Sequence, residues 1–89
     1  MTHFFSKDKL TFAVAAGREH VVDFTLAELE ERLDRRRFVR IHRATIVNVA
    51  FVQEIYPGVE GVLLRLKEGG PELSVARDRV RELKERLGI

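Results

Sequence analysis

The 89-residue sequence contains no cysteine, only two prolines and only six glycines. The lack of cysteine excludes disulfides and thiolate metal ligands. The low proline and glycine content, with 45% hydrophobic residues, is typical of a globular domain rather than a disordered segment. No apolar run approaches the ~18 residues of a membrane-spanning helix, and the start of the chain does not resemble a signal peptide. We therefore expect one small cytoplasmic domain, residues 1–89, with no membrane segment.

Residue patterns that carry catalysis or bind a cofactor are also missing. The three histidines do not have the spacing of metal ligands, and the acidic residues do not form a paired set. The two serines, Ser6 and Ser74, lie outside any nucleophile elbow. Gly69-Gly70 lacks the flanking residues of a nucleotide-binding loop. These absences predict a protein that is not an enzyme and has neither a cofactor nor a metal site.

The formal net charge of +2 conceals two adjacent blocks of opposite sign. Residues 19–34 hold six acids and one arginine, whereas residues 35–43 hold five arginines and no acid. One interpretation is a solvated surface on which neighbouring charges neutralise each other. An equally favoured interpretation is a basic patch for phosphate groups.

The densest β-branched run, residues 38–55, predicts the strands around which the rest of the chain packs. Arg40, His42 and Arg43 interrupt this run, so a rigid β scaffold would hold cations in place for an anionic partner. Other alternating or β-branched segments predict further strands. The expected strands are residues 2–6, 10–15, 19–24, 38–41, 45–49 continuing through 50–55, 62–66 and 71–75. Pro57-Gly58 indicates a type II turn, with proline at its second position and glycine at its third.

Two helices are expected among these strands. Thr25 and Glu28 have the spacing of a capping box, and the leucine stripe that follows predicts a helix over residues 26–34. Apolar residues spaced by three and four predict a terminal helix over residues 76–87, ended by Gly88. The charged residues of both helices are expected to face outward. The fold class is thus mainly β with short helices.

The segment FVRIHRATIVN, residues 38–48, resembles the signature of the LytTR DNA-binding domains. That signature runs as an aromatic residue, an arginine, an apolar residue, His-Arg-Ser, two or three apolar residues and an asparagine. The resemblance extends to the helix over residues 25–33, the hairpin over residues 63–70 and the junction Val75-Ala76-Arg77. It implies elongated antiparallel β-sheets with short helices, in a single domain that lacks the leading strand or strands of the family.

The resemblance also implies a function. Members of the family are usually output domains of bacterial response regulators in two-component systems. They bind double-stranded DNA through loops that enter successive major grooves, and tandem sites bind two copies together. The implied partners are tandem repeat sites on DNA, a receiver domain in a full-length relative, and a second copy that forms a homodimer or pairs with the open sheet edge.

The family positions map onto residues of this chain one by one. Arg43 matches the arginine of the His-Arg pair and Arg77 the arginine of the junction, both DNA-contacting places. The first contacting loop of the family falls on Ser6 to Lys9, while Asn48 matches a position that is mainly structural. The candidate DNA-binding residues are therefore Lys7, Lys9, Arg40, His42, Arg43 and Arg77.

Some of these assignments have competing explanations. His42 also fits an internal hydrogen-bonded side chain, and Arg35 to Arg37 also fit a solvated helix end. Ala44 and Ala76 stand where the family has serine, so two hydroxyls that could bind phosphate are missing and weaker affinity is expected. The alternative function is a β-rich protein-interaction or oligomerisation module. RNA binding is less favoured, because few aromatic residues are interleaved with the cations.

Overall fold

Antiparallel β-strands form most of the molecule, as the fold class predicted, and the computed structural model describes all 89 residues. Five strands form the first sheet in the order β3-β2-β1-β5-β4. Their bounds are β1 His3–Lys7, β2 Leu10–Ala15, β3 Arg18–Val22, β4 Phe38–His42 and β5 Thr45–Asn48. The second sheet, in the order β6-β7-β8, comprises β6 Val52–Pro57, β7 Val62–Leu66 and β8 Leu73–Val75. The principal extents are 32 × 24 × 22 Å.

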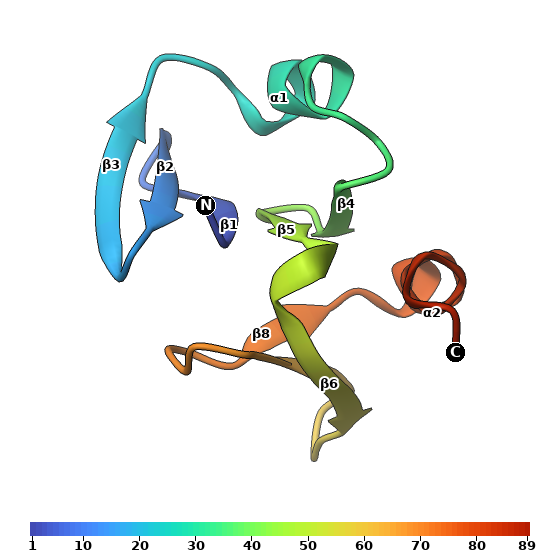
Figure 1. Cartoon of the computed structure of the whole chain (residues 1–89). Coiled ribbons are helices and arrows are strands. Elements are labelled where there is room, and N and C mark those ends of the chain that lie inside the picture. Colours follow the sequence, from blue (N-terminus) through green and yellow to red (C-terminus); the bar gives the residue numbers. More distant parts are fainter.

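Strands β4 and β5 of the first sheet lie between helix α1, Leu26–Arg32, and the second sheet (Figure 1), and a hydrophobic core lies on each side of β5. Helix α1 packs its leucines on one face, where Ile46 of β5 contributes to the core. The next residue, Val47, points to the other face and joins the core shared with the second sheet. This opposition follows from the alternation of side chains along a strand. β5 therefore connects two separate hydrophobic cores through adjacent residues.

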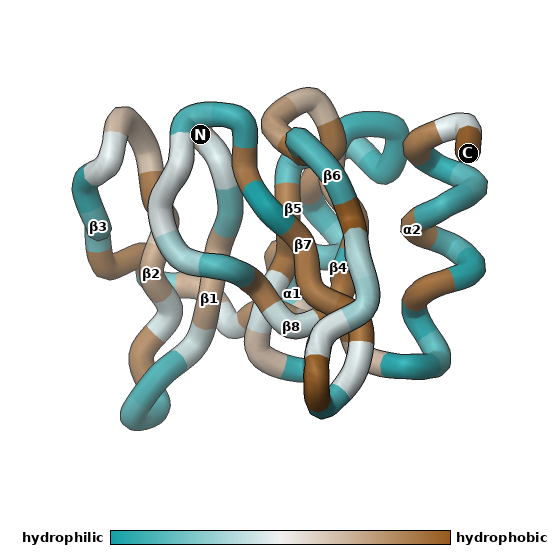
Figure 2. The backbone as a smooth tube through the Cα atoms, turned by 90° about the horizontal axis from the view of Figure 1, so that it is seen from below, coloured by the Kyte–Doolittle hydropathy of each residue, from teal (hydrophilic) through white to brown (hydrophobic).

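Helix α2, Val80–Leu87, completes the larger of the two cores. Its Leu83 is fully buried among residues of β4, β7 and β8. In Figure 2, α2 alternates between hydrophobic and hydrophilic residues along its length, as an amphipathic helix on a core surface should. Gly88 ends the helix with a φ of 75°, which confirms the expected C-terminal cap. Neither helix has the length and hydrophobicity that crossing a membrane requires.

The capping box at the start of α1 is confirmed. The Glu28 N–H donates to the Thr25 hydroxyl at 3.1 Å, and the Thr25 N–H donates to the Glu28 carboxylate at 2.9 Å. These bonds satisfy two backbone N–H groups at the helix start that have no acceptor within the helix. The helix ends at Arg32, two residues earlier than predicted, because Leu33 is already extended, with a ψ of 153°.

The prediction of one continuous strand across residues 45–55 is wrong. A 3₁₀ turn, Val49–Phe51, separates β5 from β6. The Ala50 N–H donates to the Asn48 side-chain oxygen at 3.0 Å, which caps this turn. At this point the chain leaves the first sheet and enters the second, so the β-branched run is divided between two sheets.

The type II turn predicted at Pro57-Gly58 is also wrong. Pro57 is still part of β6, and the chain reverses over residues 58–61, where the Gly58 N–H donates to the Gly61 carbonyl at 2.6 Å. Gly58 does not have a positive φ, whereas Gly61 does, at 148°. A Cβ on Gly58 would lie 2.7 Å from Leu63 Cδ1, so glycine here provides room for the packing of Leu63.

The last predicted elements are shorter in the structure. β8 spans Leu73–Val75 and excludes Pro71, which was expected to begin this strand. The residues predicted to open the terminal helix form a separate 3₁₀ turn, Arg77–Arg79, and α2 begins at Val80. No side chain caps this turn at Ala76, and its last residue, Arg79, directly precedes α2.

His3 gives the stability of the fold a testable pH dependence. The side chain is buried, and this burial lowers the pKa of His3 below its ordinary value of 6.5, while the charge of Glu19 partly opposes the shift. The unfolded chain therefore takes up this proton more readily than the folded one. Stability from this residue is complete above pH 6.5 and is lost as the pH falls below that value.

We expect the free energy of unfolding, measured by urea denaturation, to fall as the pH is lowered from about 7.5 to about 5.5. The variant His3→Gln should remove this step. The control His20→Gln, which changes an exposed histidine of β3, should keep it. Equal pH profiles for His3→Gln and the unmodified chain would contradict the assignment.

Candidate nucleic-acid interface

Two turns of the first sheet lie beside each other at one end of the strands. The β1–β2 turn is Asp8-Lys9, with φ values of 53° and 66°, so both residues are left-handed as in a tight two-residue hairpin. The β4–β5 turn is Arg43-Ala44. The Ser6 N–H donates to the Ala44 carbonyl at 3.0 Å, which joins the ends of β1 and β5. The two turns therefore project from the same end of the sheet.

The junction between β8 and the last 3₁₀ turn reaches the same place. The Ala76 N–H donates to the Ile41 carbonyl of β4 at 2.7 Å. This bond sets Arg77 beside the end of β4, from which the Arg43 turn begins. Arg43 and Arg77, which are distant in the sequence, are thus brought to the same end of the first sheet. We call residues 7–9, 43–44 and 76–77 the basic edge.

The four strongest cation candidates on this edge have no ionic partner. Lys7, Lys9, Arg43 and Arg77 are all exposed, and none of them takes part in any of the ion pairs within the chain. Several other arginines, in contrast, are paired with carboxylates. The unpaired cations of the basic edge leave a surface that can accept an anion.

His42 holds the β4–β5 turn in shape. Its Nδ1 atom accepts a hydrogen bond from the Ala44 N–H at 3.2 Å. A neutral ring that accepts at Nδ1 carries its proton on Nε2, so this second nitrogen is a hydrogen-bond donor. The half-buried ring can therefore fix the turn with one nitrogen and offer a donor with the other.

Arg40 is placed differently from the other candidates. Its side chain is only 17% exposed, and its guanidinium donates to the carbonyls of His42 at 3.3 Å and Arg43 at 2.6 Å. A further bond reaches the Glu30 carboxylate of α1 at 3.0 Å. The geometry is that of an internal brace behind the turn rather than of an open contact group.

Asn48 lies at the other end of β5, away from the basic edge. Its amide nitrogen donates to the Met1 carbonyl at 3.0 Å, while its oxygen caps the following turn. The side chain thus joins the start of the chain to the crossing between the sheets, which agrees with the structural role expected for this position.

The arginines Arg35 to Arg37 also lie away from the basic edge. They precede β4, whereas Arg43 follows it, and the Val49 N–H donates to the Arg37 carbonyl at 2.8 Å. The positive block seen in the sequence is therefore not one patch. The strand between its two halves separates them to opposite ends of the sheet.

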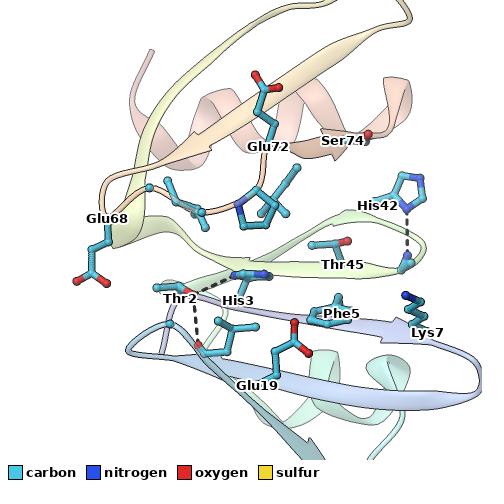
Figure 3. A pocket seen from close by; sticks show the side chains of 18 of the residues that line it. Thr2, His3, Phe5, Lys7, Glu19, His42, Thr45, Glu68, Glu72 and Ser74 are labelled. Atoms are coloured by element: carbon cyan, nitrogen blue, oxygen red, sulfur yellow. Dashed lines mark hydrogen bonds between the residues drawn. The ribbon is translucent and has the colours of Figure 1, made fainter.

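A groove of about 610 Å³ opens between the first sheet and the β7–β8 loop. Figure 3 shows Lys7, His42 and Ser74 at one end of this groove and Thr2 and Glu68 at the other. Acidic residues are confined to the walls away from the basic edge, at positions 19, 68 and 72. This distribution favours an anion at the basic edge and disfavours one deeper in the groove.

Sequence reasoning missed two features of this region. It placed Glu30 and Arg79 on outward helix faces, but both residues are half-buried. Glu30 Oε2 lies 3.8 Å from Arg79 Nη1. A signal was present for Glu30, because it lies four residues after Leu26 and one after Leu29, at the border of the apolar stripe. Nothing comparable marked Arg79.

Comparisons with known proteins identify the family. Residues 2–88 match the family described as "LytTr DNA-binding domain". The chain is 35% identical to the sensory transduction protein LytT of Enterococcus faecalis over 65 residues, which cover 73% of this chain and 27% of that protein. It is 30% identical to the transcriptional regulatory protein YpdB of Escherichia coli over 83 residues, which cover 92% of this chain and 34% of that protein.

The chain thus spans about a third or less of the length of these curated relatives. Among solved structures it is similar to a LytTr DNA-binding domain from Bacillus cereus, with a TM-score of 0.87 and 29% identity. That likeness covers 99% of this chain and 81% of the other. The family match therefore extends over nearly the whole sequence and the whole architecture, and it confirms the resemblance noted at residues 38–48. The chain belongs to the LytTr DNA-binding domain family.

Proposed function

We propose that this chain binds double-stranded DNA in a sequence-specific manner through the basic edge, as the output domain of a bacterial transcriptional regulator. One observation carries the proposal. Arg43 and Arg77 come from separate loops, are held at one end of the first sheet by backbone hydrogen bonds, and have no ionic partner. Family membership supports the same function.

The chemistry of these side chains fits the major groove. A guanidinium can donate to O6 and N7 of one guanine together, which is worth about 1–3 kcal/mol of discrimination for a good pair. Lys7 and Lys9 are point charges on flexible stems, and they suit phosphates, which position the protein without selecting a sequence. The short loops thus take the place of a recognition helix.

His42 and Arg40 have supporting roles in this proposal. The Nε2–H of His42 is available to a phosphate or a base edge, while Nδ1 holds the turn. Arg40 keeps the turn in place through its bonds to the two carbonyls and makes no direct contact with DNA.

The proposed assembly on DNA involves two copies of the domain. Two copies on tandem sites would each insert their loops into a major groove, and the unpaired outer edge of β3 is available to a second copy. In a full-length regulator a receiver domain would control this pairing. The site of action is the cytoplasm, where the bacterial chromosome lies.

A salt titration tests DNA binding against the alternative, a protein-interaction module that uses its open strand edge. The ligand is a duplex obtained by selection from a random DNA pool, and fluorescence anisotropy measures its affinity. The slope of log K against log salt should be about −2 to −4 if two to four cations neutralise phosphates. Failure to select any sequence, or an affinity that does not respond to salt, would contradict the proposal.

A further inference from the structure

We propose that Glu30 of α1 is a positioning residue that fixes the two DNA-contacting loops relative to each other. The inference rests on the proposed function, since it concerns how the same edge selects its sequence. Glu30 belongs to neither loop and lies in a helix that the proposed DNA contact does not use. Its carboxylate nevertheless reaches one arginine behind each loop.

The first arm of this arrangement supports the β4–β5 turn. Glu30 Oε1 accepts from Arg40 Nη1 at 3.0 Å. The same guanidinium donates from Nη2 to the Arg43 carbonyl at 2.6 Å and from Nε to the His42 carbonyl at 3.3 Å. The carboxylate thus orients the group that holds the backbone of Arg43. Because the Arg40 side chain is largely buried, little water competes with Glu30 and the two carbonyls for its N–H donors.

The second arm supports the junction that presents Arg77. Glu30 Oε2 lies 3.8 Å from Arg79 Nη1. The Arg79 backbone N–H donates to the Ala76 carbonyl at 2.9 Å, which closes the turn around Arg77. Arg79 Nη1 also lies 4.0 Å from Glu82 Oε1 of α2, so the Arg79 guanidinium is close to two carboxylates. One carboxylate therefore connects both loops through its two oxygens.

Packing alone does not set the spacing between these groups. Glu30, Arg40 and Arg79 line a hollow of about 370 Å³. Core side chains do not fill this space, so contacts between the polar side chains help to set the spacing. A carboxylate has two acceptor oxygens and can bridge two guanidinium groups, whereas an amide has one acceptor oxygen and a donor that faces the second arginine. Glu30→Gln should therefore break the bridge with little change in volume.

The charge of Glu30 makes the test decisive, because two roles predict opposite results. An acid near the basic edge that acts only through its charge repels all DNA, so its removal should strengthen binding to every duplex by a similar factor. A positioning residue instead supports selectivity, so its removal should weaken binding to the selected sequence alone. Glu31→Gln is the matched control, since Glu31 is the exposed neighbour on α1 and has no ion pair.

Anisotropy should be measured with the selected duplex and with a scrambled duplex of equal composition. For Glu30→Gln we expect the ratio of the two affinities to fall by at least about fivefold, since misplacing a bidentate arginine loses discrimination of this order. Glu31→Gln should keep the ratio. A ratio for Glu30→Gln equal to that of the control overturns the inference. An unmodified chain that does not distinguish the duplexes overturns the proposed function instead.

A second measurement needs no DNA. In ¹H–¹⁵N spectra of the free protein, Glu30→Gln should shift the amide signals of both loops, at Arg43 and at Arg77, and Glu31→Gln should shift neither. Arg79→Gln, which removes one arm, should shift the Arg77 signal and leave that of Arg43 in place. Signals of both loops that stay unchanged in Glu30→Gln overturn the bridge, whether or not DNA is bound.

Discussion

Replacing either Arg43 or Arg77 by alanine is expected to remove much of the preference of this domain for its cognate site. Each change should reduce affinity for the selected duplex by about 1–3 kcal/mol, the discrimination carried by one bidentate contact with guanine. Affinity for a scrambled duplex should fall much less, because the two lysines still neutralise phosphates. Loss of both arginines should leave only binding that is independent of sequence.

The fold should survive both substitutions. Arg43 and Arg77 are exposed, and neither side chain has a hydrogen-bond or ionic partner within the chain. Exposed substitutions of this kind usually change stability by less than about 0.5 kcal/mol. A change in specificity can therefore be separated from unfolding.

Fluorescence anisotropy with the two duplexes measures the effect, and circular dichroism checks the fold. The matched control is Arg18→Ala, which removes the same charge next to the β2–β3 turn, at the other end of the sheet. The control should retain the preference for the selected duplex. If Arg43→Ala and Arg77→Ala behave like Arg18→Ala, the basic edge does not select sequence.

Replacing Leu64 by alanine should lower the free energy of unfolding by about 2–5 kcal/mol, the cost of a cavity in a well-packed core. Leu64 is fully buried in β7, the central strand of the second sheet, and pairs with Ile55 on one side and Leu73 on the other. Small domains have a total stability of about 5–15 kcal/mol, so this single change removes a large share of it.

Thermal unfolding should show the effect as a fall in Tm of about 8–40 °C, given roughly 4–8 °C per kcal/mol in a domain of this size. Val59→Ala provides the control, because Val59 is fully exposed in the β6–β7 loop and packs against no core. A Tm for Leu64→Ala within a degree or two of the control value would show that the larger core does not depend on β7.

Local chemistry in the sequence was sufficient for some elements. At a helix start the Thr25 hydroxyl accepts from the Glu28 backbone N–H and the Glu28 carboxylate accepts from the Thr25 backbone N–H, so α1 could be predicted from a few residues. The alternation from Leu10 to Ala15 and its return after Gly17 likewise predicted the β2–β3 hairpin. These elements are determined by neighbours in the chain.

Features that depend on distant segments could not be predicted in this way. Val49, Ala50 and Phe51 are as compatible with a strand as the residues around them, and only the crossing between two sheets makes them a 3₁₀ turn. Glu30 has polar partners because the fold brings Arg40 of β4 and Arg79 of the last 3₁₀ turn within reach of its carboxylate. Periodicity within a helix carries no information about such partners.

The candidate site was predicted mainly through the family resemblance. Charge alone grouped Arg35 to Arg37 with Arg43, whereas the structure sends them to opposite ends of β4. The nearness of Arg43 and Arg77 is supported by the hydrogen bond from Ala76 to Ile41, which joins the residue after β8 to β4 of the first sheet. No pattern in one sequence predicts a bond of that kind.

The arrangement of β5 has a consequence for engineering. Its neighbours Ile46 and Val47 point into different cores, so a slip of one residue would exchange both sets of contacts at once. Changes in the length of the Arg43-Ala44 turn must then be absorbed by the turn itself, while the strands keep their register. We therefore expect the domain to tolerate transplanted turns from other family members, which would allow its target sequence to be reprogrammed without redesigning the scaffold.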